Sequence, residues 1–256
     1  MNTYPKPLIS IVTVCFNAET TIVPTLKSVK EQSETDYEHI IIDGASNDST
    51  LRLIEEYKSD RTVVFSEPDK GIYHAMNKGL YKSNGKYVLF LNAGDTFASS
   101  ETLSRFAEAI RQNPTADIFY GQTAIINSTG KILGPRHLTA PPRLNADSFK
   151  KGMLVCHQAF MVRHSIAPEY DTKYRFSADF DWCIRCLKNS KENIYLGSDA
   201  VAHYLNEGTT TLNHHKSLKE RYKIMCRHYG AIPTILRHIQ FAFRNVLYKI
   251  KLRFKA

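Results

Sequence analysis

The chain has 256 residues, 43% of them hydrophobic and 23% charged, which is typical of a globular protein with one large α/β domain or two small ones. No run reaches the roughly 18 to 20 apolar residues of a membrane span, and the N-terminus lacks the charged-then-apolar order of a signal peptide. The five cysteines show no disulfide spacing, so we expect a reducing, cytoplasmic compartment.

The net charge of +9 is distributed unevenly along the chain. Residues 216–256 hold 11 Lys and Arg against one acid, Glu220, which leaves 23 basic against 24 acidic residues in 1–215. Because the main part of the chain is nearly neutral, we expect no nucleic-acid partner. We therefore divide the chain into a domain of residues 1–215 and a basic amphipathic extension of residues 216–256.

Strand and helix patterns alternate over the N-terminal part of the chain. Apolar, β-rich runs predict strands at 8–17, 62–69 and 87–91, and a further strand in 37–50 that ends in a polar, glycine-containing turn. Helical spacing predicts helices at 20–32, 49–60 and 71–83, the second capped by Ser46 or Asn47. Beyond about residue 113, the segments 117–127 and 130–135 predict a hairpin and thus an antiparallel addition. The pattern indicates a mixed, mainly parallel α/β sheet with helices on both faces.

Polar side chains follow three of the predicted strands at the point where each strand ends. They lie in the segments 13–17, 43–48 and 92–95. Ligands of open α/β sheets bind at the carboxyl ends of the strands, so we expect these segments to line one crevice. Its carboxylates would repel a phosphate unless a divalent cation lay between them, and Mg²⁺ or Mn²⁺ suits such oxygen ligands.

The motifs SIVTVCFNAE, IIIDGASNDST, EPDKGIYHAMNKGL and GKYVLFLNAGD, in this order, resemble family 2 glycosyltransferases of the GT-A fold. The resemblance covers about residues 8–97 closely and extends more loosely to about residue 212. It is closest to bacterial enzymes that build surface polysaccharides such as O-antigen, capsule or exopolysaccharide. It implies an inverting hexosyl transfer from a nucleotide-diphosphate sugar, with UDP favoured over GDP, and Mn²⁺ or Mg²⁺ as cofactor.

The same resemblance implies roles for individual residues. Asp43 would help hold the base and ribose, and Asp95 matches the metal-binding acid of the family's DxD motif. Asn92 stands where the family often has an acid, and its amide can bond a ribose or sugar hydroxyl. Lys70 can meet a phosphate, and Asp69 can accept from the base or ribose. We also place Thr13, Asn17, Asn77 and His157 at the nucleotide sugar. The segment AVAHYLNEGTTT (200–211) resembles the family's loop that closes over the donor, and its His203 would lie at the metal or diphosphate.

Inverting transfer needs one carboxylate that takes the proton of the acceptor hydroxyl. The segment YRFSADFDWCIRCLK offers two acids, and Asp179 matches the base of the family. Asp181 and Arg185 have the i, i+4 spacing of an ion pair, so we interpret Asp181 as structural. Because Ala178 replaces a neighbouring acid of the family, no like charge should raise the pKa of Asp179.

Residues 232–254, placed on a helix, gather apolar side chains in one arc with basic residues at its edges. This is typical of a helix in the interface of an anionic membrane, and a helix packed on the core is the alternative. Enzymes that resemble this chain commonly extend a glycan on a polyprenyl diphosphate. We therefore expect a lipid-linked acceptor and a peripheral location on the inner face of the plasma membrane.

Two other functions fit the sequence less well. A sugar nucleotidyltransferase would usually carry a glycine-rich phosphate loop after the first strand, and VCFNAETT contains no glycine. A non-catalytic nucleotide-sugar-binding or nucleic-acid-binding module would not need both Asp95 and Asp179.

Overall fold

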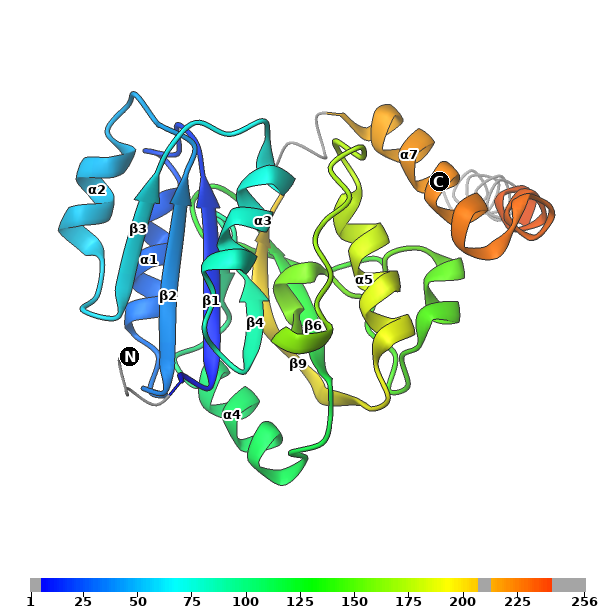
Figure 1. Ribbon diagram of the computed structural model, residues 1–256, viewed down its shortest axis with the longest axis horizontal. Coiled ribbons are helices and arrows are strands. Elements are labelled where there is room, and N and C mark those ends of the chain that lie inside the picture. Colours follow the sequence, from blue (N-terminus) through cyan, green and yellow to red (C-terminus); the bar gives the residue numbers. More distant parts are fainter. Residues whose placement is uncertain (1–5, 207–212, 241–256) are drawn as a thin grey trace, which may run out of the picture.

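The computed structural model describes residues 6–206 and 213–240. One mixed sheet of nine strands runs through the described chain in the order β3-β2-β1-β4-β8-β6-β9-β5, with β7 paired to β6 (Figure 1). This confirms the predicted mixed α/β fold.

The N-terminal half is parallel. Its strands are β1 (Ile9–Cys15), β2 (Tyr37–Asp43), β3 (Thr62–Ser66) and β4 (Tyr87–Phe90), and its helices are α1 (Ile22–Lys30), α2 (Thr50–Tyr57) and α3 (Ile72–Lys82). Every residue of β1 is buried, because α1 and α3 cover opposite faces of the sheet (Figure 1). The continuous apolar runs that predicted β1, β2 and β4 reflect this double coverage.

The C-terminal half adds antiparallel pairs. It contains β5 (Thr96–Phe97), α4 (Thr102–Gln112), β6 (Ile118–Ile126), β7 (Ile132–Pro135), η1 (Ala146–Lys151), η2 (His157–Ala159), β8 (Phe160–Arg163), η3 (His164–Ile166), α5 (Ala178–Asn189) and β9 (Asn193–Leu205). The β6–β7 hairpin confirms the prediction at 117–135. β8 is antiparallel to both β4 and β6, and this arrangement brings η2, just before β8, next to the end of β4.

Two local predictions were wrong. α2 begins at Thr50 after Ser49, because Ser46 instead bonds the carboxylate of Asp43. The segment 200–205, interpreted as part of a loop, belongs to β9.

The described part of the expected extension packs on the domain. α7 (His214–Tyr229) places Ile224 and Met225 in the main core. This helix is therefore packed against the domain of residues 1–215. A further helix occupies residues 231–240, and the rest of the predicted helix 232–254 lies outside the described residues. In the part of the chain that is described, no helix is both long and apolar enough to cross a bilayer.

Candidate active site

Two loops at the carboxyl ends of β1 and β2 are joined by side-chain to backbone hydrogen bonds. Asn17 Oδ1 accepts from Asn47 N at 3.1 Å, and Ser46 Oγ accepts from Asn17 N at 2.8 Å. Asp43, fully buried at the end of β2, accepts from Ser46 N at 2.9 Å and from Ser66 Oγ at 2.7 Å. Asp43 therefore organises the loop and does not face solvent.

An exposed aromatic ring lies beside this loop. Phe16, directly after β1, is 61% exposed. A Cβ atom at Gly44 would lie 2.7 Å from Asp69 Oδ2 and 3.2 Å from Phe16 Cδ2, so glycine allows the loop to approach both side chains. Asp69 accepts from Gly71 N at 2.7 Å, which fixes the carboxylate at the start of α3. Lys70 is exposed in the same turn.

Asp95 closes the polar segment NAGD that follows the buried strand β4, and its carboxylate accepts two hydrogen bonds. Its Oδ1 accepts from Leu205 N at 3.0 Å, and its Oδ2 accepts from Gln158 Nε2 at 2.6 Å. Burial raises the pKa of Asp95 to about 6, although both hydrogen bonds act in the opposite direction. The carboxylate thus ties together the end of β4, the end of β9 and η2.

Asp179 lies in the first turn of α5, where the helix dipole favours a carboxylate. Its Oδ1 accepts from Tyr73 OH at 2.9 Å, and its Oδ2 lies 3.4 Å from His157 Nδ1. Burial opposes ionisation, but His157, Arg221 and Tyr73 together outweigh it, so the pKa of Asp179 lies below its ordinary value. The side chain is 14% exposed and can be reached by a small hydroxyl group.

The adjacent residues His157 and Gln158 join the two carboxylates into one site. His157 contacts Asp179 through Nδ1 and the Asn92 amide through Nε2, the latter at 3.1 Å. Gln158 bonds Asp95. Asp95 and Asp179 are 84 positions apart in the sequence, but in the structure each contacts one of two adjacent residues.

Two acceptor oxygens of this site are buried without a hydrogen-bond partner among the described residues. They are Asn92 Oδ1 and Gln158 Oε1. An unpaired buried acceptor costs roughly 1 to 3 kcal/mol, and such groups recur at ligand sites. A ligand that donates hydroxyl protons, or a cation, suits both oxygens.

The structure does not bring Thr13 or Asn77 to the site. Thr13 is fully buried between strands, and its hydroxyl lies 2.9 Å from His39 Nε2. Asn77 forms two hydrogen bonds, of 3.0 and 2.7 Å, with the backbone of Tyr170. Both side chains hold the fold together, and we omit them from the proposed donor site.

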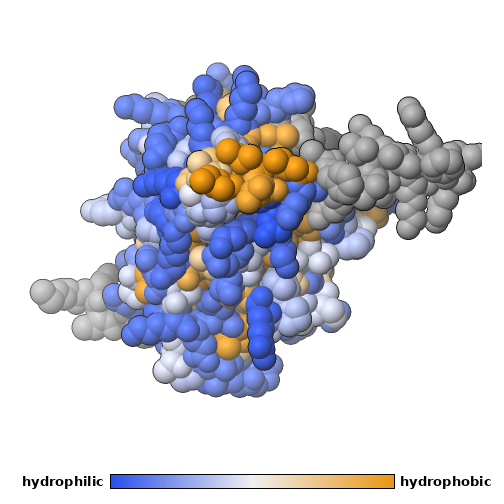
Figure 2. All heavy atoms as spheres, turned by 90° about the vertical axis from the view of Figure 1, so that its right-hand side faces the viewer, coloured by the Kyte–Doolittle hydropathy of each residue, from blue (hydrophilic) through white to orange (hydrophobic). Residues whose placement is uncertain are grey.

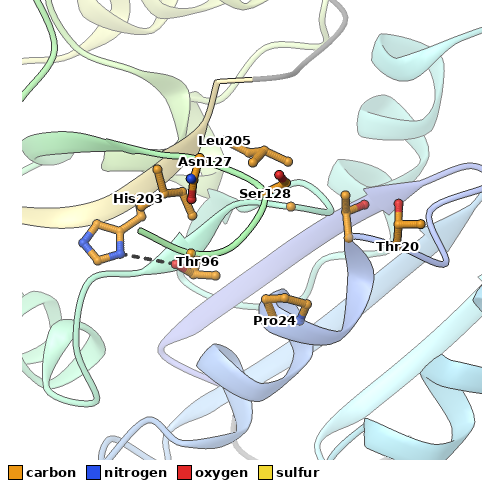
Figure 3. Close-up of a pocket in the computed structure, with 11 residues that line it drawn as sticks. Thr20, Pro24, Thr96, Asn127, Ser128, His203 and Leu205 are labelled. Carbon is orange, nitrogen blue, oxygen red and sulfur yellow. Dashed lines mark hydrogen bonds between the residues drawn. The ribbon is translucent and has the colours of Figure 1, made fainter. Parts of the chain in front are cut away.

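The side chain of His203 contacts Thr96, the residue after Asp95, at 3.5 Å. It pairs with Thr96 in the β5–β9 ladder and lines a pocket of about 90 Å³, and in Figure 3 its ring turns toward Thr96 and away from Thr20 and Pro24. This pocket is too small for a nucleotide sugar. Within residues 6–206 and 213–240, no three His, Cys, Asp or Glu side chains gather closely enough to hold a metal.

The oxygen donors around Asp95 still fit a divalent cation. Mg²⁺ and Mn²⁺ commonly bind through one or two carboxylates, with substrate phosphates and water as the other ligands. Asp95 supplies one carboxylate, each of whose oxygens carries one protein hydrogen bond. The unpaired amide oxygens nearby are of the same hard-donor type.

The interpretation of Asp181 is confirmed. Asp181 is fully buried and bonds Arg185 Nε at 2.6 Å and His228 Nε2 at 2.7 Å. Three contributors to the site were missed: Phe16, Gln158 as the partner of Asp95, and Tyr73 as the donor to Asp179. A bulky ring directly after a buried strand could have indicated Phe16, whereas the other two depend on contacts between distant segments.

Known proteins share both sequence and fold with the chain. The family model described as Glycosyl transferase family 2 matches residues 10–170. A PGL/p-HBAD biosynthesis glycosyltransferase of Mycobacterium bovis is 32% identical over 190 residues, which cover 72% of this chain and 71% of the relative.

Two solved structures are similar in fold. TarS of S. aureus, residues 1–349 in complex with UDP-GlcNAc, has a TM-score of 0.69 at 17% identity and covers 91% of this chain and 73% of its own. The mannosyltransferase PcManGT from Pyrobaculum calidifontis, in complex with GDP-Man and Mn²⁺, has a TM-score of 0.64 at 15% identity, with coverages of 93% and 70%. At these identities the comparison shows a shared fold.

Proposed function

The chain belongs to glycosyl transferase family 2, and from this premise we propose an inverting hexosyl transfer from a nucleotide-diphosphate sugar to a glycan. The observation that carries the proposal is the connection of Asp95 to Asp179 through His157 and Gln158. It provides a donor-side and an acceptor-side carboxylate within one site.

The nucleotide would bind at the joined loops that follow β1 and β2. The exposed ring of Phe16 offers an apolar face to a base. The carboxylate of Asp69 can accept hydrogen bonds from the base or ribose, and Asp43 holds the neighbouring loop in place. Asn17 and Lys70 lie at the rim, where Lys70 can meet a phosphate. UDP is the favoured nucleotide, and GDP is the alternative, since similar folds bind sugars of both.

Asp95 would hold Mn²⁺ or Mg²⁺, which when bound supplies positive charge for a departing diphosphate. Asn92 and Gln158 would accept from sugar hydroxyls through their unpaired oxygens. A hydroxyl that satisfies a buried acceptor removes a desolvation cost, so these two side chains can orient the transferred sugar.

Asp179 would act as the general base. An inverting transfer forms the new bond from the acceptor oxygen to the anomeric carbon while the bond to the diphosphate breaks, and the hydroxyl proton passes to Asp179. Tyr73 and His157 fix the carboxylate from both sides. Burial raises the pKa of Tyr73 well above its ordinary value, with the charge of Asp179 adding to the effect, so the phenol remains a hydrogen-bond donor.

The acceptor would be a lipid-linked glycan in the synthesis of a surface polysaccharide. Such an acceptor stays at a membrane, and the enzyme would work peripherally at its cytoplasmic face. Support comes from the basic C-terminal residues and from the sequence resemblance.

A nucleotide-release assay tests the proposal. The purified chain is incubated with Mn²⁺ and a panel of UDP- and GDP-sugars, and free UDP or GDP is measured with and without glycan acceptors. We expect one sugar nucleotide to be consumed with an acceptor-dependent rate, and proton NMR of the product to give the anomer opposite to that of the donor. Thermal stabilisation by nucleotides without consumption of any donor would favour a binding module.

A further inference from the structure

The last helix of the described chain, residues 231–240, turns aliphatic side chains toward solvent. Ile232, Ile235, Leu236 and Ile239 share one face through i, i+3, i+4 and i+7 spacing, and they are 74%, 45%, 58% and 60% exposed. We call these four side chains the isoleucine face. A patch of orange atoms with hydrophilic surroundings marks it in Figure 2.

Polar groups hold the other side of this helix to α7. Thr234 is 1% exposed and donates from Oγ1 to Gly230 O at 2.7 Å. The ring of His238 packs edge-on against Tyr222, with centroids 5.1 Å apart. The fold thus buries a threonine and leaves the four aliphatic side chains outward, and a contiguous apolar patch of this kind marks an interaction surface.

The segment that carries the isoleucine face is basic, although its Arg227 is paired with Asp171 at 2.9 Å. Residues 213–240 contain a single acid, Glu220, and its carboxylate accepts from the backbone N–H groups of Arg175 and Phe176. The basic residues of the same segment are Lys216, Lys219, Arg221, Lys223, Arg227 and Arg237. Lys216, Lys219 and Lys223 are exposed on α7, so the surroundings of the patch attract anions.

We propose that the isoleucine face and the lysines of α7 dock onto a membrane surface that contains anionic phospholipid. The aliphatic side chains would enter the boundary between headgroups and acyl chains, and the lysines would contact anionic headgroups. A protein partner fits less well, because protein interfaces favour aromatic and arginine anchors and are depleted of lysine.

α7 also links the docking surface to the candidate base. Ser217 Oγ lies 2.8 Å from Ser177 Oγ, and Ser177 directly precedes α5, which carries Asp179 in its first turn. The carboxylate of Glu220 fixes the backbone just before Ser177. The docked surface and the base are therefore parts of one packed unit. Only the purpose of this link, access to a lipid-linked acceptor, rests on the function proposed above.

Vesicle co-sedimentation of the full chain tests the docking proposal. Sucrose-loaded vesicles are made of phosphatidylcholine alone or of phosphatidylcholine mixed with phosphatidylglycerol. We expect the wild type to sediment with the mixed vesicles and to be released by salt, which screens the lysines. Leu236→Asp and Ile232→Asp should each lower the vesicle partition coefficient by about tenfold or more.

Tyr81→Asp is the matched control, because it places the same charge at a side chain that is 85% exposed on α3, and it should bind vesicles like the wild type. The proposal is wrong if the wild type stays in the supernatant or if Leu236→Asp binds equally well. It is also wrong if sedimentation velocity gives a dimer that Leu236→Asp dissociates while vesicles remain unbound. A chain that binds vesicles but consumes no sugar nucleotide would refute the proposed function and leave the docking proposal standing.

Discussion

A histidine inside the sheet makes the stability of this protein depend on pH. His39 on β2 is 1% exposed, and its Nε2 lies 2.9 Å from Thr13 Oγ1. Burial lowers the pKa of His39 from 6.5 to about 3. The folded protein therefore keeps the ring neutral at pH values at which the unfolded chain binds a proton.

The sign and size of the effect follow from linkage. The stabilisation is complete above pH 6.5 and is lost as the pH falls from 6.5 toward the folded value of about 3. Well below pH 6.5 the free energy of unfolding falls by about 1.4 kcal/mol per pH unit. Between about pH 7.5 and about pH 5 the loss from this one ring is about 2 kcal/mol.

Urea unfolding of the wild type and of His39→Gln, at several pH values in this range, measures the effect. Other groups titrate there as well, including Asp95, whose pKa burial raises to about 6, so the informative quantity is the difference in slope between the two proteins. We expect His39→Gln to flatten the pH dependence by about 2 kcal/mol over the range, and His137→Gln, at an exposed histidine, to leave it unchanged. Parallel curves for the wild type and His39→Gln would refute the reasoning.

Three further changes test other parts of the molecule. Gly44→Ala places a methyl group 2.7 Å from Asp69 Oδ2, so calorimetry should give roughly tenfold weaker binding of UDP or GDP; unchanged affinity would remove this loop from the donor site. Asp181→Asn leaves Arg185 and His228 without their buried carboxylate and should lower the unfolding free energy by about 3 kcal/mol, whereas a loss below about 1 kcal/mol would mean that the pair is dispensable. Because the pKa of Asp179 is lowered, whereas burial raises the pKa of Asp95 to about 6, kcat at saturating Mn²⁺ and donor should stay level as the pH falls from about 8 to about 7, and an acidic limb above about pH 7 would contradict the assignment of the base.

The sequence predicted the parallel half of the sheet well, because three of its four strands, β1, β2 and β4, are buried along almost their whole length. β2 occupies the first half of the segment 37–50, before its polar turn, and the hairpin pattern after residue 113 matches β6 and β7. Glycine and polar residues after apolar runs marked the strand ends, so the placement of Asp43 and Asp95 at one edge followed from topology alone.

The errors concern side chains whose partners are distant in sequence. Asn77 has the right helical position for a ligand contact, but it bonds the backbone of Tyr170, 93 positions away. Thr13 on β1 bonds His39 on the neighbouring strand β2. The β5–β9 register pairs His203 with Thr96. A single sequence contains neither the register nor the direction of these side chains.

The C-terminal extension shows the same limit. Its charge and its amphipathic pattern were readable from the sequence. Its attachment was not, since it depends on contacts of Ile224 and Met225 with the main core and of His228 with Asp181. The local sequence pattern predicts the helix, whereas its position against the core and Asp181 depends on tertiary contacts.

The central claim is that Asp95 binds the donor through the metal and Asp179 acts as the general base, both within one site. Donor binding and turnover of Asp179→Asn and Asp95→Asn, measured side by side with Mn²⁺ and the sugar nucleotide that the wild type consumes, test it most directly. Asp179→Asn should lower kcat by roughly 10²- to 10⁴-fold and bind the donor like the wild type, and Asp95→Asn should lose donor affinity. Turnover of Asp179→Asn at the wild-type rate, or equal donor affinity in all three proteins, would contradict the account.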